Sequence, residues 1–242
     1  MVLGTWLLLS ALPLILVSVF SLRAEGFIFV KYYKGDLAIS VIIASCLVAI
    51  NIVLFLCSVL IHAFNSESRK NVIYLFDFLW IFAALLPSSI LVEFLRTTFI
   101  SFESIYQTQI IVVIGQLISI GFIAVLAGRW VVESANTKTL LSLDGKRSIF
   151  ELLVRLQPRI FASMIVVSGL TIGFSLSELA MTSQLSPPAT NQPIAGALLN
   201  AMHYQRPQVI TSLLAFFVLV AIVLGALFYI LHRKLILFVC AS

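Results

Sequence analysis

The chain of 242 residues is 61% hydrophobic and only 10% charged, with a formal net charge of +5 and a mean hydropathy of +1.14. Soluble globular domains carry about 25% charged residues, so this composition excludes that class and predicts a membrane protein. The net positive charge indicates membrane orientation rather than nucleic-acid binding, because no basic cluster is interleaved with aromatic residues that face solvent. The three cysteines lie in or beside apolar runs without CxxC spacing. They favour small buried side chains over a metal or redox site, and we expect no cofactor.

A transmembrane helix needs about 20 consecutive apolar residues, and six stretches of the chain meet that requirement. They span approximately residues 3–22, 37–64, 72–95, 108–128, 160–179 and 209–231. The first stretch has no basic n-region and no clear cleavage site, which favours an uncleaved span over a signal peptide. The sequence therefore predicts a single all-α membrane domain over residues 1–242, with six transmembrane helices.

The distribution of Lys and Arg predicts the orientation, since cytoplasmic loops carry an excess of both. With the loop 129–159 inside, both termini also lie inside, and ten of the fifteen Lys and Arg residues are cytoplasmic. The basic residues of the first external connection oppose this bias locally: Arg23, Lys31 and Lys34. The prediction is a multi-pass protein of the cell (inner) membrane with an N-in/C-in topology.

The loop 129–159 is the longest non-apolar run between hydrophobic stretches. Between Gly145 and Pro158, apolar residues recur at helical spacing, at Ile149, Leu152, Leu153 and Leu156. Glycine permits a sharp turn into this short helix, and Pro158 suits the start of the next one. An amphipathic helix of this kind fits a groove on a partner protein. It fits the lipid headgroups equally well, and the residues alone leave the choice open.

Four residues in or beside the spans are candidates for a transport pathway or a gate: Asp77, Pro87, Glu93 and Glu178. Ionisable groups inside a membrane usually face the bundle interior or a pore. Asp77 lies only ~7 Å from the inner end of its span, at 1.5 Å per residue, and the two glutamates lie near the outer boundary. Interfacial carboxylates that reach water are therefore the simpler interpretation. Pro87 lies within a span, where it removes a helix hydrogen bond and predicts a kink.

The external loop 180–208 holds four of the seven prolines of the chain. Within it, the segment Ile194–Tyr204 is apolar enough for a short helix at the membrane surface. Irregular backbone at membrane depth is tolerated where protein or a water-filled cavity satisfies it, so this loop is a candidate lining of an external vestibule. No Ser-His-Asp set, HExxH motif or P-loop is present. We therefore expect no enzyme activity from this chain, and any ATP hydrolysis belongs to a separate subunit.

Three motifs occur in a fixed order along the chain. The segment TLLSLDGKRSIFELLVRLQP has LDG at Leu143–Gly145, followed by a thirteen-residue step to Pro158. This spacing is similar to that of a cytoplasmic EAA loop, although Thr139, Leu140 and Leu141 occupy the EAA positions. The other two motifs are ALLPSSILVEFL and FSLSELAMTSQLSPPATNQPIAGALLNAMHYQRPQVITSLLAF. Together the three resemble membrane subunits of binding-protein-dependent ABC importers, in the group for iron(III), thiamine, phosphonates and polyamines.

The resemblance implies a type I ABC-importer permease-like fold. It implies that a cytoplasmic ABC ATPase contacts a coupling loop at residues 139–158, through Leu143, Asp144, Gly145, Phe150, Leu153 and Pro158. The other implied partners are a second permease subunit, in a homodimer or heterodimer, and an external substrate-binding protein, besides the lipid bilayer and without nucleic acid. The alternatives are a gradient-driven secondary transporter, an accessory subunit of a membrane complex, and a structural membrane scaffold.

Overall fold

The computed structural model describes residues 33–63, 70–134, 149–187, 192–204, 210 and 212–213, and every regular element in these ranges is an α-helix. The helices are α3 (Lys34–Ala63), α4 (Lys70–Leu85), α5 (Ser88–Phe99), α6 (Glu103–Tyr106), α7 (Ile110–Ser134), α9 (Ile149–Ser177), α10 (Ala180–Leu185) and α11 (Ile194–His203). The predicted all-α class is therefore confirmed for the described part of the chain.

Within the described part of the chain, three helices are long and apolar enough to cross a membrane: α3, α7 and the Gln157–Ser177 part of α9. At 1.5 Å per residue the 30 residues of α3 extend over about 45 Å, more than the hydrocarbon core of about 30 Å. These helices correspond to the predicted spans 37–64, 108–128 and 160–179. The predicted span 3–22 lies outside the described residues, as does nearly all of 209–231, so the count of six stays a prediction.

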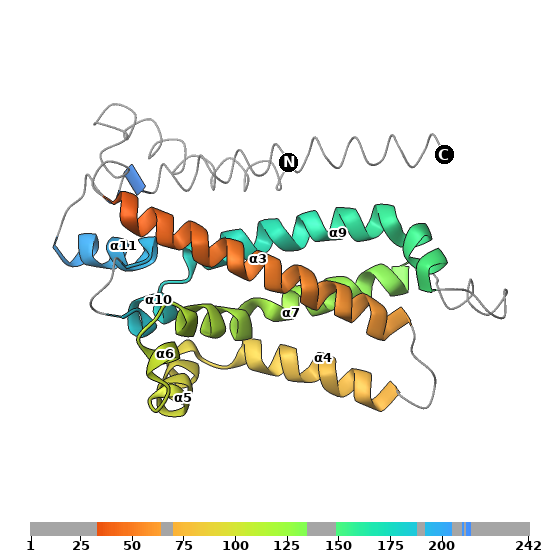
Figure 1. Cartoon of the computed structure of the whole chain (residues 1–242), viewed down its shortest axis with the longest axis horizontal. Helices are drawn as coiled ribbons and strands as arrows, with labels where there is room; N and C mark the ends of the chain where they lie inside the picture. The colour runs from red at the N-terminus through yellow and green to blue at the C-terminus, as the bar shows by residue number, and fades with distance from the viewer. Residues whose placement is uncertain are drawn as a thin grey trace, which may run out of the picture.

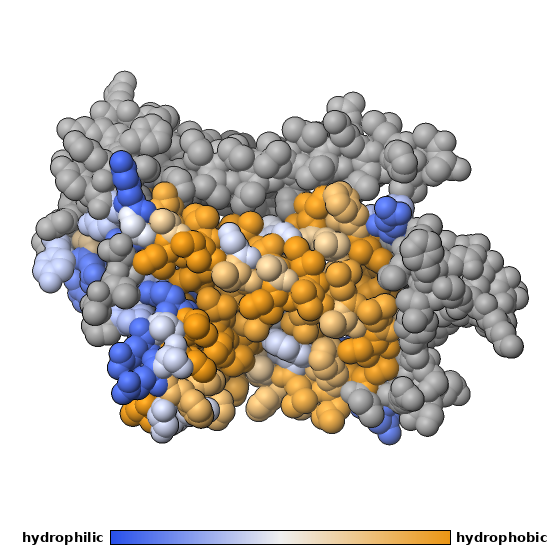
Figure 2. Space-filling model, viewed as in Figure 1, coloured by the Kyte–Doolittle hydropathy of each residue, from blue (hydrophilic) through white to orange (hydrophobic). Residues whose placement is uncertain are grey.

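The long helices form a bundle in which α3, α7 and α9 pack against one another and α4 lies along α7 (Figure 1). The chain enters α3 and α7 at one end of the bundle and α4 and α9 at the other (Figure 1). The short helices α5, α6, α10 and α11 gather at the first of these ends, here called the α11 end. Figure 2 shows an apolar band across the middle, with hydrophilic residues at both ends. This arrangement indicates a membrane-embedded protein.

The surface of α3 explains why this bundle suits lipid. Its exposed face is apolar and includes Val41, Ile42 and Val53, whereas its buried face includes Ser40 and Asn51. In water that exposed face would favour aggregation, but in a bilayer the lipid chains cover it, and helix association then depends on close packing and interhelical hydrogen bonds. The core of this protein therefore contains the polar side chains that a soluble bundle would place outside.

The predicted span 72–95 is not one continuous helix. α4 ends at Leu85, α5 begins at Ser88, and the two parts are bent by 104° at the break. Pro87 is the N-cap residue of α5 and has an extended ψ of 134°. Because proline also disfavours helical backbone in the residue before it, the effect of Pro87 is a break and not the predicted kink. The 16 residues of α4 extend over about 24 Å, so α4 and α5 together form one broken span or a re-entrant segment.

Pro158 does not begin a new helix, contrary to the prediction. α9 runs from Ile149 to Ser177 with Pro158 inside it. A proline removes one backbone hydrogen bond and crowds the carbonyl four residues earlier, and a bend of the helix relieves that clash. Figure 1 shows the first turns of α9 leaning away from the rest of the helix. The segment predicted as a separate short helix is thus the first part of α9.

A close helix contact in the bundle core lies between α3 and α7 at Gly128. A Cβ atom at Gly128 would lie 2.7 Å from Cβ and Oγ of Ser58, and 2.9 Å from the carbonyl oxygen of Phe55. Such distances exclude any side chain at this position unless the helices separate. Small residues are the usual means by which membrane helices approach this closely.

We expect Gly128→Ala to destabilise the bundle by about 1–3 kcal/mol, the usual cost of overpacking a core. The obstacle is a backbone oxygen, which cannot rotate away as a side chain would. The measurement is the free energy of unfolding in mixed detergent micelles. The matched control is Gly173→Ala, since a Cβ there meets nothing within 4 Å. In a helix interior this control should be neutral or stabilise by about 0.5–1 kcal/mol; equal effects of the two substitutions would contradict the close contact.

Candidate functional site

The buried face of α3 carries polar side chains along its length. Ser40, Asn51 and Ser58 are each at most 4% exposed, and the His62 side chain is 9% exposed. Their spacing places them on one face of the helix, since residues three, four, seven or eleven apart line up along it. Each meets a polar group of a neighbouring helix. Polar side chains thus follow the interior of the bundle from the α11 end to the end where α4 begins.

At the α11 end, Gln116 of α7 joins α7 to α9 and α10. The Ser175 hydroxyl donates a hydrogen bond to Gln116 Oε1 at 2.7 Å, and Gln116 Nε2 donates to Thr182 Oγ1 at 3.0 Å. Gln116 Nε2 also lies 3.4 Å from the carbonyl oxygen of Ser175. A buried amide needs partners for both its donor and its acceptor, and here both are satisfied. These residues, Gln116, Ser175 and Thr182, are called the Gln116 group below.

A small cavity lies beside the Gln116 group. It is lined in part by Ser40, Gln116, Ser175 and Ile194, and its volume of about 10 Å³ is enough for about one water molecule. Ser40 Oγ accepts a hydrogen bond from the Ile194 backbone N–H at 2.7 Å, which joins α3 to the start of α11. The helix predicted at 194–204 is confirmed as α11. Its start lines this cavity, which is too small in this conformation for any solute beyond the size of water.

In the middle of the bundle, Asn51 of α3 meets Thr171 of α9. Asn51 Nδ2 donates to Thr171 Oγ1 at 3.2 Å, and both residues are fully buried. Asn51 Oδ1 has no hydrogen-bond partner among the described atoms. An unpaired buried carbonyl of this kind costs about 1–3 kcal/mol, so it marks a place where a water molecule or a solute would be stabilised.

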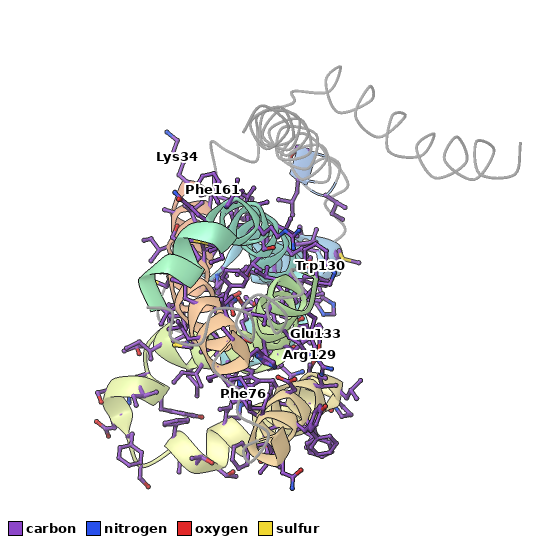
Figure 3. All side chains as sticks on the ribbon, turned by 90° about the vertical axis from the view of Figure 1, so that its right-hand side faces the viewer. Lys34, Phe76, Arg129, Trp130, Glu133 and Phe161 are labelled. Atoms are coloured by element: carbon purple, nitrogen blue, oxygen red, sulfur yellow. The ribbon has the colours of Figure 1, made fainter. Side chains whose placement is uncertain are left out.

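At the opposite end, Asp77 of α4 joins three helices. It is 3% exposed, and its Oδ2 atom lies 3.2 Å from Nη1 of Arg129 on α7 and 3.2 Å from Nε2 of His62 on α3. Arg129 Nε in turn donates to Glu133 Oε1 at 2.8 Å. Figure 3 views this end of the molecule and shows Arg129 and Glu133 between α7 and α4. These residues, His62, Asp77, Arg129 and Glu133, are called the Asp77 group below.

The candidate gate and pathway residues are not brought together. Asp77 is buried and ion-paired, whereas its position in the sequence favoured a carboxylate that reaches water. Glu93 is exposed on α5, and Pro87 lies at the helix break. Glu178 has a local role, because its Oε1 accepts the Met181 backbone N–H at 3.1 Å at the start of α10.

The candidate coupling residues are described only in part. Leu143, Asp144 and Gly145 lie outside the described residues. Phe150 and Leu153 lie in the first turns of α9, and Pro158 lies inside the same helix. The contact of these residues with an ATPase stays a prediction.

Sequence reasoning missed His62, Asn51 and Gln116, and it used Arg129 only to assign topology. A signal was present for the residues of α3, because Ser40, Asn51, Ser58 and His62 share one helical face. No comparable signal marks Gln116, which is a single polar residue in a long apolar run.

A comparison of the chain with protein-family models, with curated proteins and with solved structures finds no match. Function is therefore inferred from the helices and side chains described above and from the motifs in the sequence.

We expect Gln116→Leu to destabilise the bundle by about 1–3 kcal/mol, because it leaves the buried Ser175 hydroxyl without its acceptor. The free energy of unfolding in detergent measures this effect. The control is Gln107→Leu at an exposed turn, which should change it by less than about 0.5 kcal/mol. Adding Ser175→Ala to Gln116→Leu should recover part of the loss, since removal of both partners is nearly neutral; a further loss would show that the hydrogen bond is unimportant.

Proposed function

We propose that this chain is the membrane-embedded permease subunit of an ABC importer, which forms a substrate pathway and couples it to a separate cytoplasmic ATPase. The observation that carries the proposal is the polar face buried inside a bundle of apolar helices, at Ser40, Asn51, Ser58 and His62. Polar groups inside membrane helices are costly and mark transport pathways by default. The three motifs in their order narrow a general transporter to an importer permease. The proposal includes six spans, an N-in/C-in topology and a location in the cell membrane.

The arrangement of helices at the α11 end supports the proposal that the substrate pathway begins at that side. The broken segment α4–α5 and the short helix α11 both lie there, and transporters often form their sites from discontinuous helices. The cavity beside Gln116 has room for about one water molecule, so this conformation is closed to larger solutes. Opening requires α11 to move away from α3, which breaks the hydrogen bond between Ser40 and the Ile194 backbone.

The continuity of α9 supports a route from an ATPase to the bundle interior. Phe150, Thr171 and Ser175 all belong to this one helix, and 21 residues separate Phe150 from Thr171, about 31 Å at 1.5 Å per residue. An ATPase that binds the first turns of α9 and displaces them would also displace the buried side chains of the same helix. ATP binding could shift the transport equilibrium only if the ATPase binds the two conformations with different affinity.

The partners follow from this role. A second permease subunit would complete the pathway, and an external substrate-binding protein would deliver the substrate at the α11 end. The exposed apolar surfaces of the helices outside the subunit contact are covered by lipid. Selection among substrates then belongs mainly to the binding protein, because the described cavity presents hydroxyl and amide groups with no charged side chain among its lining residues.

A gradient-driven secondary transporter is the second candidate, and the Asp77 group is the observation that favours it. A buried carboxylate paired with a histidine and an arginine is typical of ion and proton relays in transporters. If the protein is a secondary transporter, transport depends on Asp77 and not on ATP.

Reconstitution with any ABC ATPase that is encoded beside this chain distinguishes the two candidates. For the importer we expect ATP hydrolysis that depends on the permease. The double substitution Phe150→Ala and Leu153→Ala should reduce ATPase binding by more than about 10-fold, as expected when an interface loses about 2 kcal/mol. The control is Glu93→Gln, an exposed residue on α5, which should leave binding unchanged.

The importer is contradicted if no adjacent ATPase binds the wild-type chain, or if the double variant binds it as well as the control does. Transport without ATP that is abolished by Asp77→Asn would establish the secondary transporter instead.

A further inference from the structure

The hydrogen bonds of Ser58 fix the position of its one hydroxyl proton. Ser58 Oγ lies 2.8 Å from the carbonyl oxygen of Val125 on α7. A carbonyl oxygen only accepts, so the serine must donate its proton to it. Ser58 Oγ therefore has no proton left to donate to the His62 ring, although His62 Nδ1 lies 3.3 Å away.

His62 Nδ1 must consequently carry a proton. It lies 2.8 Å from the backbone carbonyl oxygen of Ser58, one helical turn earlier. At this distance a nitrogen without a hydrogen would place its lone pair against the lone pairs of the carbonyl. The network thus assigns Nδ1 as a donor, which is how the tautomer of a histidine is determined when its hydrogens are not observed directly.

The other ring nitrogen then requires a second proton. A neutral imidazole has one N–H, and here it is used at Nδ1. His62 Nε2 nevertheless lies 3.2 Å from Asp77 Oδ2. If Asp77 were ionised and His62 neutral, two lone pairs would face each other across this distance. An attractive contact needs a proton between the two atoms, either on Nε2 or on the carboxyl group.

We propose that His62 and Asp77 form a buried site that binds one proton. The side chains are 9% and 4% exposed, respectively, so water screens the pair little. Among the described residues, the other ionisable groups that face it belong to α7 and α4. Arg129 contacts the same Asp77 oxygen, Glu133 pairs with Arg129, and the Tyr74 ring lies 5.9 Å from the Arg129 guanidinium. Such a site is compatible with either energy source, ATP hydrolysis or an ion gradient, because it consists of these atoms alone.

The proton controls the contact between α3 and α4. With the proton bound, His62 and Asp77 attract and the end of α3 is linked to α4. When it leaves, the His62 contact is lost, while Arg129 still holds Asp77 to α7. Asp77 Oδ1 has no partner among the described atoms, so it offers no compensating bond. The link between α3 and α4 therefore depends on whether the pair holds its proton.

Nuclear magnetic resonance of the full chain in lipid bilayers tests the site directly, with ¹⁵N-labelled histidine and ¹³C-labelled aspartate carboxyl groups. The chain has three histidines, and the signals of His62 are identified by their loss in His62→Gln. We expect a protonated Nδ1 and one further proton, on Nε2 or on Asp77. A neutral His62 protonated only at Nε2, beside an ionised Asp77, would overturn the proposal.

Thermal unfolding gives a second readout. We expect His62→Gln to lower the Tm, because it removes the contact between the end of α3 and Asp77. His203→Gln is the matched control, because His203 is exposed at the end of α11, and its Tm should match that of the wild type. If His62→Gln unfolds at the wild-type Tm, the pair does not link α3 to α4 as proposed.

Asp77→Asn provides a separate check that does not depend on the folding of His62→Gln. It removes the negative charge that favours a proton on His62. We expect the His62 ring in this variant to carry a single proton, on Nδ1. A doubly protonated His62 in this variant would contradict a site shared between the two residues.

Discussion

At Gly128 the absence of a side chain lets Ser58 of α3 lie directly against α7. This contact places the Ser58 hydroxyl on the carbonyl oxygen of Val125, and His62 follows one turn later on the same face of α3. Arg129, the residue after Gly128, reaches Asp77 from α7. The contact of His62 with Asp77 is therefore favoured by the close approach of α3 and α7 at one glycine. A larger residue there would separate the partners by more than a hydrogen bond tolerates.

The bilayer explains why the polar residues lie inside. Lipid offers no hydrogen bonds, so a polar side chain on the outer surface would be unsatisfied, whereas one in the bundle finds a partner. Three interhelical groups, around Gln116, Asn51 and Asp77, use this principle at successive levels. Where every partner is satisfied, as around Gln116, such a group stabilises and rigidifies the bundle.

The length and composition of the apolar runs were sufficient to predict the main helices. Runs of about 20 apolar residues predicted α3, α7 and the apolar part of α9, and the apolar segment after the prolines predicted α11. Pro87 predicted a kink in the helix, but the sequence could not predict how large the bend between α4 and α5 is. The angle at a break depends on what the next helix packs against. Here Leu91, Val92 and Leu95 of α5 are buried against α7 and α10, and this packing favours the turned position.

The candidate site was predictable only in part. The depth of Asp77 within its span suggested contact with water, but that estimate took no account of the neighbouring helices. α7 continues to Ser134, beyond the predicted end of its span, and so brings Arg129 over Asp77. The partners of Asp77 are 15 and 52 residues away, a separation that a local pattern cannot reveal.

Thiol labelling of single cysteines in intact cells and in inverted vesicles tests most directly whether the bundle spans the membrane as described. In a chain without its three native cysteines, Ser66→Cys and Ser142→Cys should react from one side of the membrane, and Gln107→Cys and Tyr204→Cys from the other. Labelling of residues 66 and 107 from the same side would show that α4 and α5 do not cross, and would contradict a bundle that spans the membrane in this order.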